Sequence, residues 1–141
     1  MGCDIHLVLE QRDADLGWVG IDTFAGHESS YGRGYNSPAA RSRNYKLFAA
    51  LAGVRGDGPT PRGIPEDAST TTRLLVKELG SDGHSHSWLP LIDAAREWNV
   101  ERYTAEKLRD GYQEKFPESF WFGIDSEMDL SKYRVVFWFD N

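Results

Sequence analysis

The 141-residue chain has a formal net charge of −6 and is rich in aromatic residues, with 5 Trp, 6 Tyr and 7 Phe. So many large apolar side chains favour a packed core over a disordered chain, and the length suits one domain over residues 1–141. The sequence has no apolar run of the roughly 18–20 residues that a membrane span needs, and we expect no secretory leader because no basic segment is followed by an apolar stretch. With a single cysteine, Cys3, the sequence predicts a cytoplasmic protein that does not enter a membrane.

Positive charge is concentrated in residues 33–73, where seven Lys and Arg face three Asp and Glu, a local net charge of +4. The rest of the chain therefore carries −10. An acidic chain is a poor binder of duplex nucleic acid, but its cationic middle favours a small anionic partner such as a nucleotide. Arginines that are simply solvated in loops would give the same pattern.

The first predicted element is a strand over residues 3–10, in which apolar and polar side chains alternate. Its apolar face consists of Cys3, Ile5, Leu7 and Leu9. The opposite face consists of Asp4, His6 and Glu10, interrupted by Val8. Turn-forming residues then lead to a second strand over residues 17–22, so we predict an N-terminal hairpin.

The middle of the chain alternates between loops and helices. Residues 25–40 are rich in Gly, Ser and Tyr and predict an exposed loop. A helix is predicted over residues 44–53, where Gly53 suits the position after its last turn. Several Gly and Pro residues exclude a regular element over residues 54–68, and a second helix is predicted over residues 72–79.

The C-terminal part predicts two more helices and a hairpin. Pro90 suits the first turn of a helix over residues 90–98, and another helix is expected over residues 104–115. The aromatic and β-branched segments 120–124 and 133–139 predict a C-terminal hairpin. The predicted fold is a single α+β domain, with an antiparallel sheet built from the two terminal hairpins and three to four helices packed on it.

Three of the four histidines lie in two i, i+2 arrangements, Asp4-Ile5-His6 and His84-Ser85-His86. In extended backbone such side chains share a face, so each pair can offer two ligands to one divalent cation. The predicted metal ligands, for Zn or Mn, are Asp4, His6, His84 and His86. The predicted acid/base groups are Glu10, Asp82 and His84. The same histidines also suit acid/base chemistry without a metal, or a structural role.

A second set of residues suits an anionic ligand. The chain has neither of the standard glycine-rich phosphate motifs. Guanidinium groups and aromatic rings can still hold a phosphate and stack on a base. The predicted substrate-binding residues are Tyr35, Arg43, Arg55, Arg62 and Trp88.

Three motifs extend these expectations: Met1-Gly2-Cys3-Asp4-Ile5-His6 at the start, Asp82-Gly83-His84-Ser85-His86-Ser87-Trp88 in the centre, and Phe137-Trp138-Phe139-Asp140-Asn141 at the end. Together they resemble a family of small bacteriophage-encoded proteins whose activity is not established. The resemblance implies a phage protein in the bacterial host cytoplasm, with an accessory role in nucleotide metabolism or in evading nucleotide-signalling defence. It adds Tyr45 and Asp140 to the residues of interest.

Three functions from different classes follow from these patterns. The first is a metal-dependent hydrolase acting on a phosphate-containing small molecule, with a nucleotide as the expected substrate. The second is a binding protein that sequesters a nucleotide signal without cleaving it. The third is a protein–protein inhibitor of a host factor, in which the acidic remainder of the chain forms the active surface.

Overall fold

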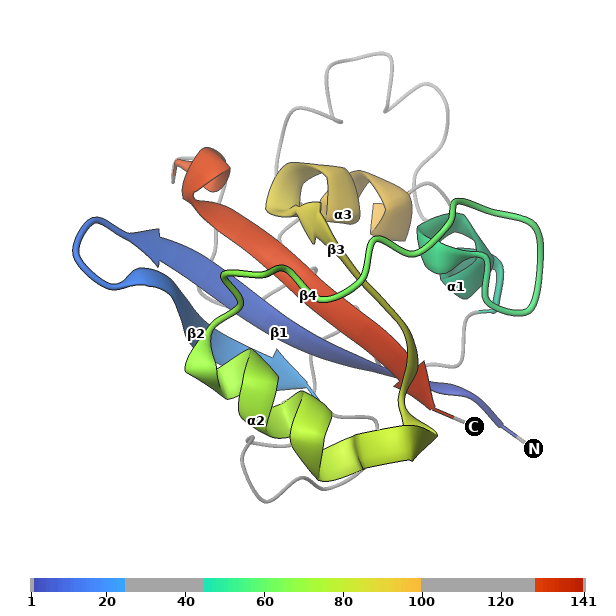
Figure 1. Ribbon diagram of the computed structural model, residues 1–141. Helices are drawn as coiled ribbons and strands as arrows, with labels where there is room; N and C mark the ends of the chain where they lie inside the picture. The colour runs from blue at the N-terminus through green and yellow to red at the C-terminus, as the bar shows by residue number, and fades with distance from the viewer. Residues whose placement is uncertain (1, 25–44, 100–128, 141) are drawn as a thin grey trace, which may run out of the picture.

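The two ends of the chain meet at the centre of one antiparallel sheet (Figure 1). The computed structural model describes residues 2–24, 45–99 and 129–140. Its strands are β1 (Asp4–Asp13), β2 (Gly17–Phe24), β3 (His84–Pro90) and β4 (Tyr133–Asp140). They lie in the order β2-β1-β4-β3, so the predicted N-terminal hairpin and antiparallel sheet are confirmed.

The partners of β4 differ from those predicted. This strand pairs with β1 along one edge and with β3 along the other. Both edges are therefore hydrogen-bonded, and the expected pairing of residues 133–139 with residues 120–124 in a hairpin is wrong. Residues 120–124 themselves lie outside the described part of the chain, as do the predicted loop 25–40 and the predicted helix 104–115.

The described helices are α1 (Tyr45–Ala52), α2 (Thr70–Leu79) and α3 (Leu91–Asn99), with single 3₁₀ turns η2 (Gly80–Asp82) and η4 (Leu130–Lys132). All three helices were predicted within a few residues. Gly53 follows α1 with φ +68°, a conformation that glycine adopts without strain. Pro90 ends β3 rather than opening α3. None of these helices has the length and apolar character needed to cross a membrane.

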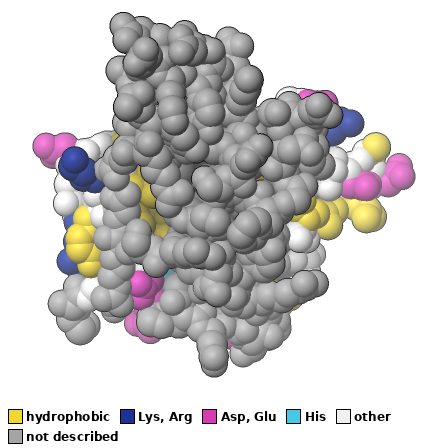
Figure 2. Space-filling view, turned by 180° about the vertical axis from the view of Figure 1, so that it is seen from behind, with side chains coloured by type: hydrophobic (Ala, Val, Ile, Leu, Met, Phe, Trp, Pro, Cys, Tyr) yellow, Lys and Arg dark blue, Asp and Glu magenta, His cyan; other side chains and the backbone are white. Residues whose placement is uncertain are grey.

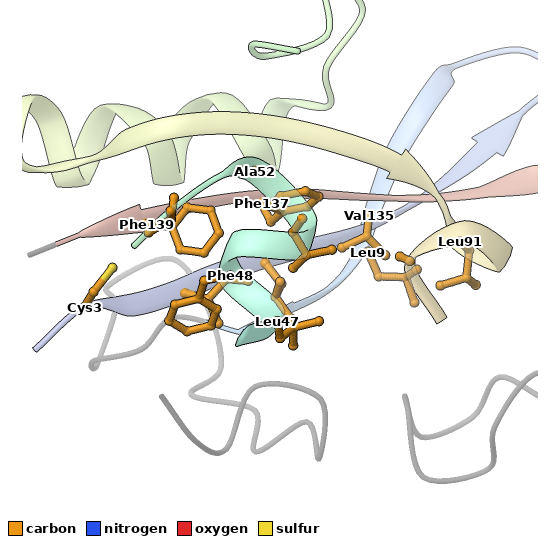
Figure 3. Packing of buried hydrophobic residues seen from close by; sticks show 14 of the residues in the cluster. Cys3, Leu9, Leu47, Phe48, Ala52, Leu91, Val135, Phe137 and Phe139 are labelled. Atoms are coloured by element: carbon orange, nitrogen blue, oxygen red, sulfur yellow. The ribbon is translucent and has the colours of Figure 1, made fainter. Parts of the chain in front are cut away.

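One face of the sheet packs against α1 and α3. Figure 3 places Leu47 and Phe48 of α1 over the sheet residues Leu9, Val135 and Phe139. The predicted apolar face of β1 belongs to this cluster, and Cys3 is fully buried within it. Burial of these side chains supplies the main driving force for folding.

The other face is covered by α2 (Figure 1), and its strand residues are also buried. Val8, which interrupts the polar face of β1, packs against Leu75, Val136 and Trp138. Burial of both faces explains why β4 is buried along its whole length. The sequence predicted a polar face for β1, and the structure places that face against a helix.

Glu10 of β1 lies beneath α2 and connects β1, β4 and α2. It is completely buried, and its Oε1 accepts a 2.6 Å hydrogen bond from Nε of Arg134, which is also buried. Its Oε2 accepts hydrogen bonds from the backbone N–H of Ser69 and from the hydroxyl of Thr72, each at 2.7 Å. Ser69 is the N-cap of α2, so one carboxylate joins β1, β4 and the start of α2.

We predict that Glu10→Gln lowers the free energy of unfolding by about 3 kcal/mol, because it leaves the buried Arg134 guanidinium without its main counter-charge. Urea denaturation followed by tryptophan fluorescence measures the change. Glu66→Gln is the matched control, because Glu66 is exposed and such substitutions usually shift stability by less than about 0.5 kcal/mol. Equal unfolding midpoints for the two variants would contradict the role given to Glu10.

Candidate functional site

A row of aromatic rings crosses the α2 face of the sheet near the chain termini. His6 of β1 and Trp138 of β4 are directly opposed in the register, and their rings stack at 5.9 Å with 10° between the planes. His86 of β3 also stacks on Trp138, and the centroids of these two rings are 6.1 Å apart. Nε2 of His6 lies 2.8 Å from Oδ2 of Asp140, and both residues are buried.

His84 and His86 do not share a face. The register of β3 shifts between His84 and Ser87, where Ser85 has φ +55°. As a result, His84 lies beside Phe139 and His86 beside Trp138. Successive residues of a strand point to opposite faces, so the bulge separates the two histidines that a regular strand would align.

The four predicted metal ligands are thus distributed over both faces of the sheet. Among the residues with described positions, no three His, Cys, Asp or Glu side chains are grouped as a metal ion requires. The backbone N–H of Asp4 donates to Oδ1 of Asp140 at 3.3 Å. Asp82 is exposed at the end of η2, and both oxygens of Glu10 already accept hydrogen bonds. A metal at these residues stays a prediction.

The predicted substrate-binding residues are separated as well. Arg62 lies over the ring of Trp88, with its guanidinium carbon 4.9 Å from the ring centroid. Arg55 makes a similar contact with Tyr45 at 4.8 Å, at the end of α1. Tyr35 and Arg43 lie outside the described residues. The structure therefore brings together one predicted pair, Arg62 and Trp88.

Arg62 also lines a groove between α1, β3 and α3, with a volume of about 360 Å³. This volume is within the range of small-molecule sites. The apolar part of its lining includes Leu51 of α1 and Leu89 of β3. The loop after α1 contributes Pro59 and Thr60. The polar side chains of the groove are those of Thr60, Arg62, Ser87, Asp93 and Glu97.

The groove has an acidic wall. Asp93 and Glu97 are four residues apart on α3, so they lie on one side of the helix. Burial raises the pKa of the Glu97 carboxyl, and the nearby charge of Asp93 raises it further. The wall can therefore combine a carboxylate with a carboxyl group that keeps its proton to a higher pH than usual.

The loop that carries Arg62 is held against β3 by hydrogen bonds. The backbone N–H of Arg62 donates to the hydroxyl of the buried Ser87 at 3.1 Å, and the N–H of Gly63 donates to the carbonyl of His86 at 2.8 Å. Gly58 allows the loop to turn against α1, because a Cβ there would lie 1.7 Å from the carbonyl oxygen of Ala49. Arg62 is thus positioned by its backbone as well as by Trp88.

Most residues of this groove were not predicted from the sequence. The spacing of Asp93 and Glu97 could have indicated a functional site. Like charges four residues apart destabilise a helix, so such a pair suggests a role other than helix stability. Helix stability can explain Asp93, since an acidic side chain in the first turn suits the helix dipole, but it does not explain Glu97. Ser87 carried no signal of its own, because only the register of β3 places it in the groove.

Figure 2 shows the molecule from behind, and the charged side chains that it colours along the margins include both Lys or Arg and Asp or Glu. The described surface in this view thus mixes both signs. An anionic ligand would therefore depend on local contacts, such as those that Arg62 can provide, rather than on a broad positive field.

We predict that His86 makes the protein less stable in acid. Burial lowers the pKa of His86, and the neighbouring His84 lowers it further. The unfolded chain, with a histidine pKa of about 6.5, then binds the proton more tightly than the folded chain. Stability is complete above this value and falls as the pH drops toward the lower folded pKa.

His86→Phe tests this prediction because it keeps a ring against Trp138 and removes the titrating group. Urea unfolding midpoints from pH 5 to 8 should fall less steeply toward acid for the variant than for the wild type. Parallel curves for the two proteins would refute the prediction.

We compared the chain with protein-family models, with curated proteins and with solved structures, and none of them matches it. The likeness to small bacteriophage proteins therefore stays a prediction. A function for this chain has to be inferred from its own geometry, and the groove lined by Arg62 and the acidic wall of α3 is its strongest basis.

Proposed function

We propose that the protein binds a small phosphate-containing molecule of the nucleotide class in the groove between α1, β3 and α3. The observation that supports this most strongly is that the exposed residue Arg62 lines this groove of about 360 Å³, while its guanidinium stacks on Trp88, a residue of the neighbouring strand β3 that packs on the α2 face of the sheet. An arginine held in this way can meet two phosphate oxygens with little loss of side-chain freedom.

The charges of the groove favour a ligand with two different ends. Arg62 attracts a phosphate, whereas Asp93 and Glu97 would repel one. The phosphate therefore lies at the Arg62 end, and a group that donates hydrogen bonds faces α3. A nucleotide meets both requirements, because its phosphate and its base are separated by the sugar.

The row formed by His6, Trp138 and His86 is a weaker candidate for ligand binding. His6 and Trp138 are 5% and 2% exposed, so a ligand has almost no access to them in this conformation. The pairing of His6 with Asp140 joins the first and last described strands, which favours a structural role for these two residues.

We predict that Arg62→Gln weakens nucleotide binding by about tenfold or more, because it removes a charge-assisted hydrogen bond to phosphate. Isothermal titration calorimetry with GMP, AMP, CMP and UMP measures the affinities. Lys77→Gln is the matched control, since it removes one exposed positive charge on α2.

Wild-type binding tighter than about 1 mM, lost in Arg62→Gln and kept in Lys77→Gln, supports the proposal. No heat from any of the four nucleotides, or equal affinities for the two variants, overturns it.

Hydrolysis of the bound molecule is a second candidate function, and one observation favours it. The Glu97 carboxyl group lines the groove, and its raised pKa lets it deliver a proton to a leaving group.

For this second candidate we predict that turnover by the wild type falls as the pH rises through the Glu97 pKa, because the acid form is the active one. Glu97→Gln should abolish turnover and retain binding. Chromatography of the nucleotide recovered after denaturing an incubated complex distinguishes the two functions. Product indicates hydrolysis, and intact nucleotide indicates sequestration.

A further inference from the structure

We propose that Ser85 is a nucleophile that accepts an acyl group from an ester, with His84 as the base that takes its proton. The two residues lie where β3 begins, beside the end of β4 (Figure 1). Oγ of Ser85 lies 3.0 Å from Nδ1 of His84, and both residues are partly exposed. This activity goes beyond nucleotide binding in the groove and does not depend on it.

The first argument is the hydrogen bond between the two side chains. A serine hydroxyl is a weak nucleophile until a neighbouring base removes its proton, and hydrogen-bonding distance between the two groups is the structural sign of such a pair. When Nδ1 of His84 is the unprotonated nitrogen, it accepts the Ser85 proton directly. The His84 ring also lies beside the fully buried ring of Phe139, with 6.3 Å between the centroids, which limits the orientations that the imidazole can adopt.

The second argument is the backbone of Ser85, which lies in the bulge between His84 and Ser87. Its φ of +55° is a conformation that residues other than glycine rarely adopt, and the only other such residue in the described part of the chain is Arg55. Strained backbone of this kind is concentrated at functional sites, and the nucleophilic serine of one large group of hydrolases lies on such a turn.

The bulge also explains why the two side chains can meet. In a regular strand successive side chains point to opposite faces, so neighbouring residues could not form this hydrogen bond. Bulges commonly re-aim a side chain next to an active site. The irregularity that separates His84 from His86 therefore allows His84 to reach Ser85.

The third argument concerns the group that is transferred. Transfer of a phosphoryl group relies on cations such as Lys or Arg to hold its charge. Residues 81–88 contain neither, and the same is true of residues 137–140 at the end of the neighbouring strand β4. The two segments instead carry the carboxyl side chains of Asp82 and Asp140. An uncharged carboxylic ester therefore suits this pair better than a phosphate ester.

The proposed step is an acyl transfer. Oγ of Ser85 forms a bond to the acyl carbon, the ester C–O bond breaks, and the alcohol oxygen leaves with the electron pair. The proton of Oγ passes to Nδ1 of His84 and from there to the leaving oxygen. Water then attacks the acyl carbon by the same route, which yields a carboxylic acid and restores the hydroxyl.

Acylation by p-nitrophenyl acetate tests the proposal, because this uncharged ester releases a coloured phenolate. The full wild-type chain should release it faster than buffer alone, and peptide mapping by mass spectrometry should find the acetyl group on Ser85. Ser85→Gly removes the hydroxyl without adding strain, since glycine adopts positive φ readily. This variant should fold and should release no more phenolate than buffer.

Two further variants complete the test. His84→Asn keeps a hydrogen-bonding side chain beside Ser85 and removes the base, so it should slow acylation by about a hundredfold or more. Ser81→Gly is the matched control, because it removes a hydroxyl in the same way at an exposed position in η2. It should keep the wild-type rate, and circular dichroism spectra establish that each variant is folded.

Acetylation of Ser85 that is lost in Ser85→Gly and slowed in His84→Asn supports the proposal. A wild-type rate equal to that of buffer, an acetyl group found only at other residues, or an undiminished rate in Ser85→Gly overturns it. An undiminished rate in His84→Asn overturns the role of His84 as the base.

Discussion

The buried ion pair between Glu10 and Arg134 is the interaction on which the rest of the fold depends. It joins β1 to β4, two strands from opposite ends of the chain, and the same carboxylate holds the first turn of α2. Taking both charges out of water is expensive, and the cost is offset only because each oxygen of Glu10 is hydrogen-bonded. Arg134 also lies 4.1 Å from the Trp18 ring and donates to Asp67, so its guanidinium is enclosed by partners.

This anchor determines how the sheet is covered. With α2 held at its N-terminus, the face that carries His6 and Trp138 is buried, and the polar side chains there must find partners within the protein. His6 finds Asp140, whereas Nε2 of His86 and Nε1 of Trp138 have no hydrogen-bond partner among the described residues. The opposite face packs against α1 and α3, and the groove forms where these two helices meet β3.

Only part of the candidate site could be predicted from the sequence. Arg62 and Trp88 were predicted as binding residues, and the structure brings them into contact because β3 is the outer strand of the four described ones and the loop containing Arg62 runs along it. Asp93 was not predicted, although the helix that carries it was. The histidine motif drew attention through its spacing, but spacing implies a shared face only in a regular strand, and the bulge at Ser85 removes that regularity.

The sequence by itself determined the local elements: the alternation along β1, the turn that closes the N-terminal hairpin, and the helices that end near Gly53 and Gly80. These depend on interactions between residues close in the chain, which pattern and turn chemistry describe. Only the tertiary structure decided that β4 lies between β1 and β3, that Glu10 is an anchor, and that His84 and His86 lie on opposite faces. Strand order and register depend on contacts between residues distant in sequence, which local patterns do not report. The two histidine motifs therefore pointed to a site that the register divides, while Asp93 and Glu97 obtained their neighbours from the packing of α3 beside β3.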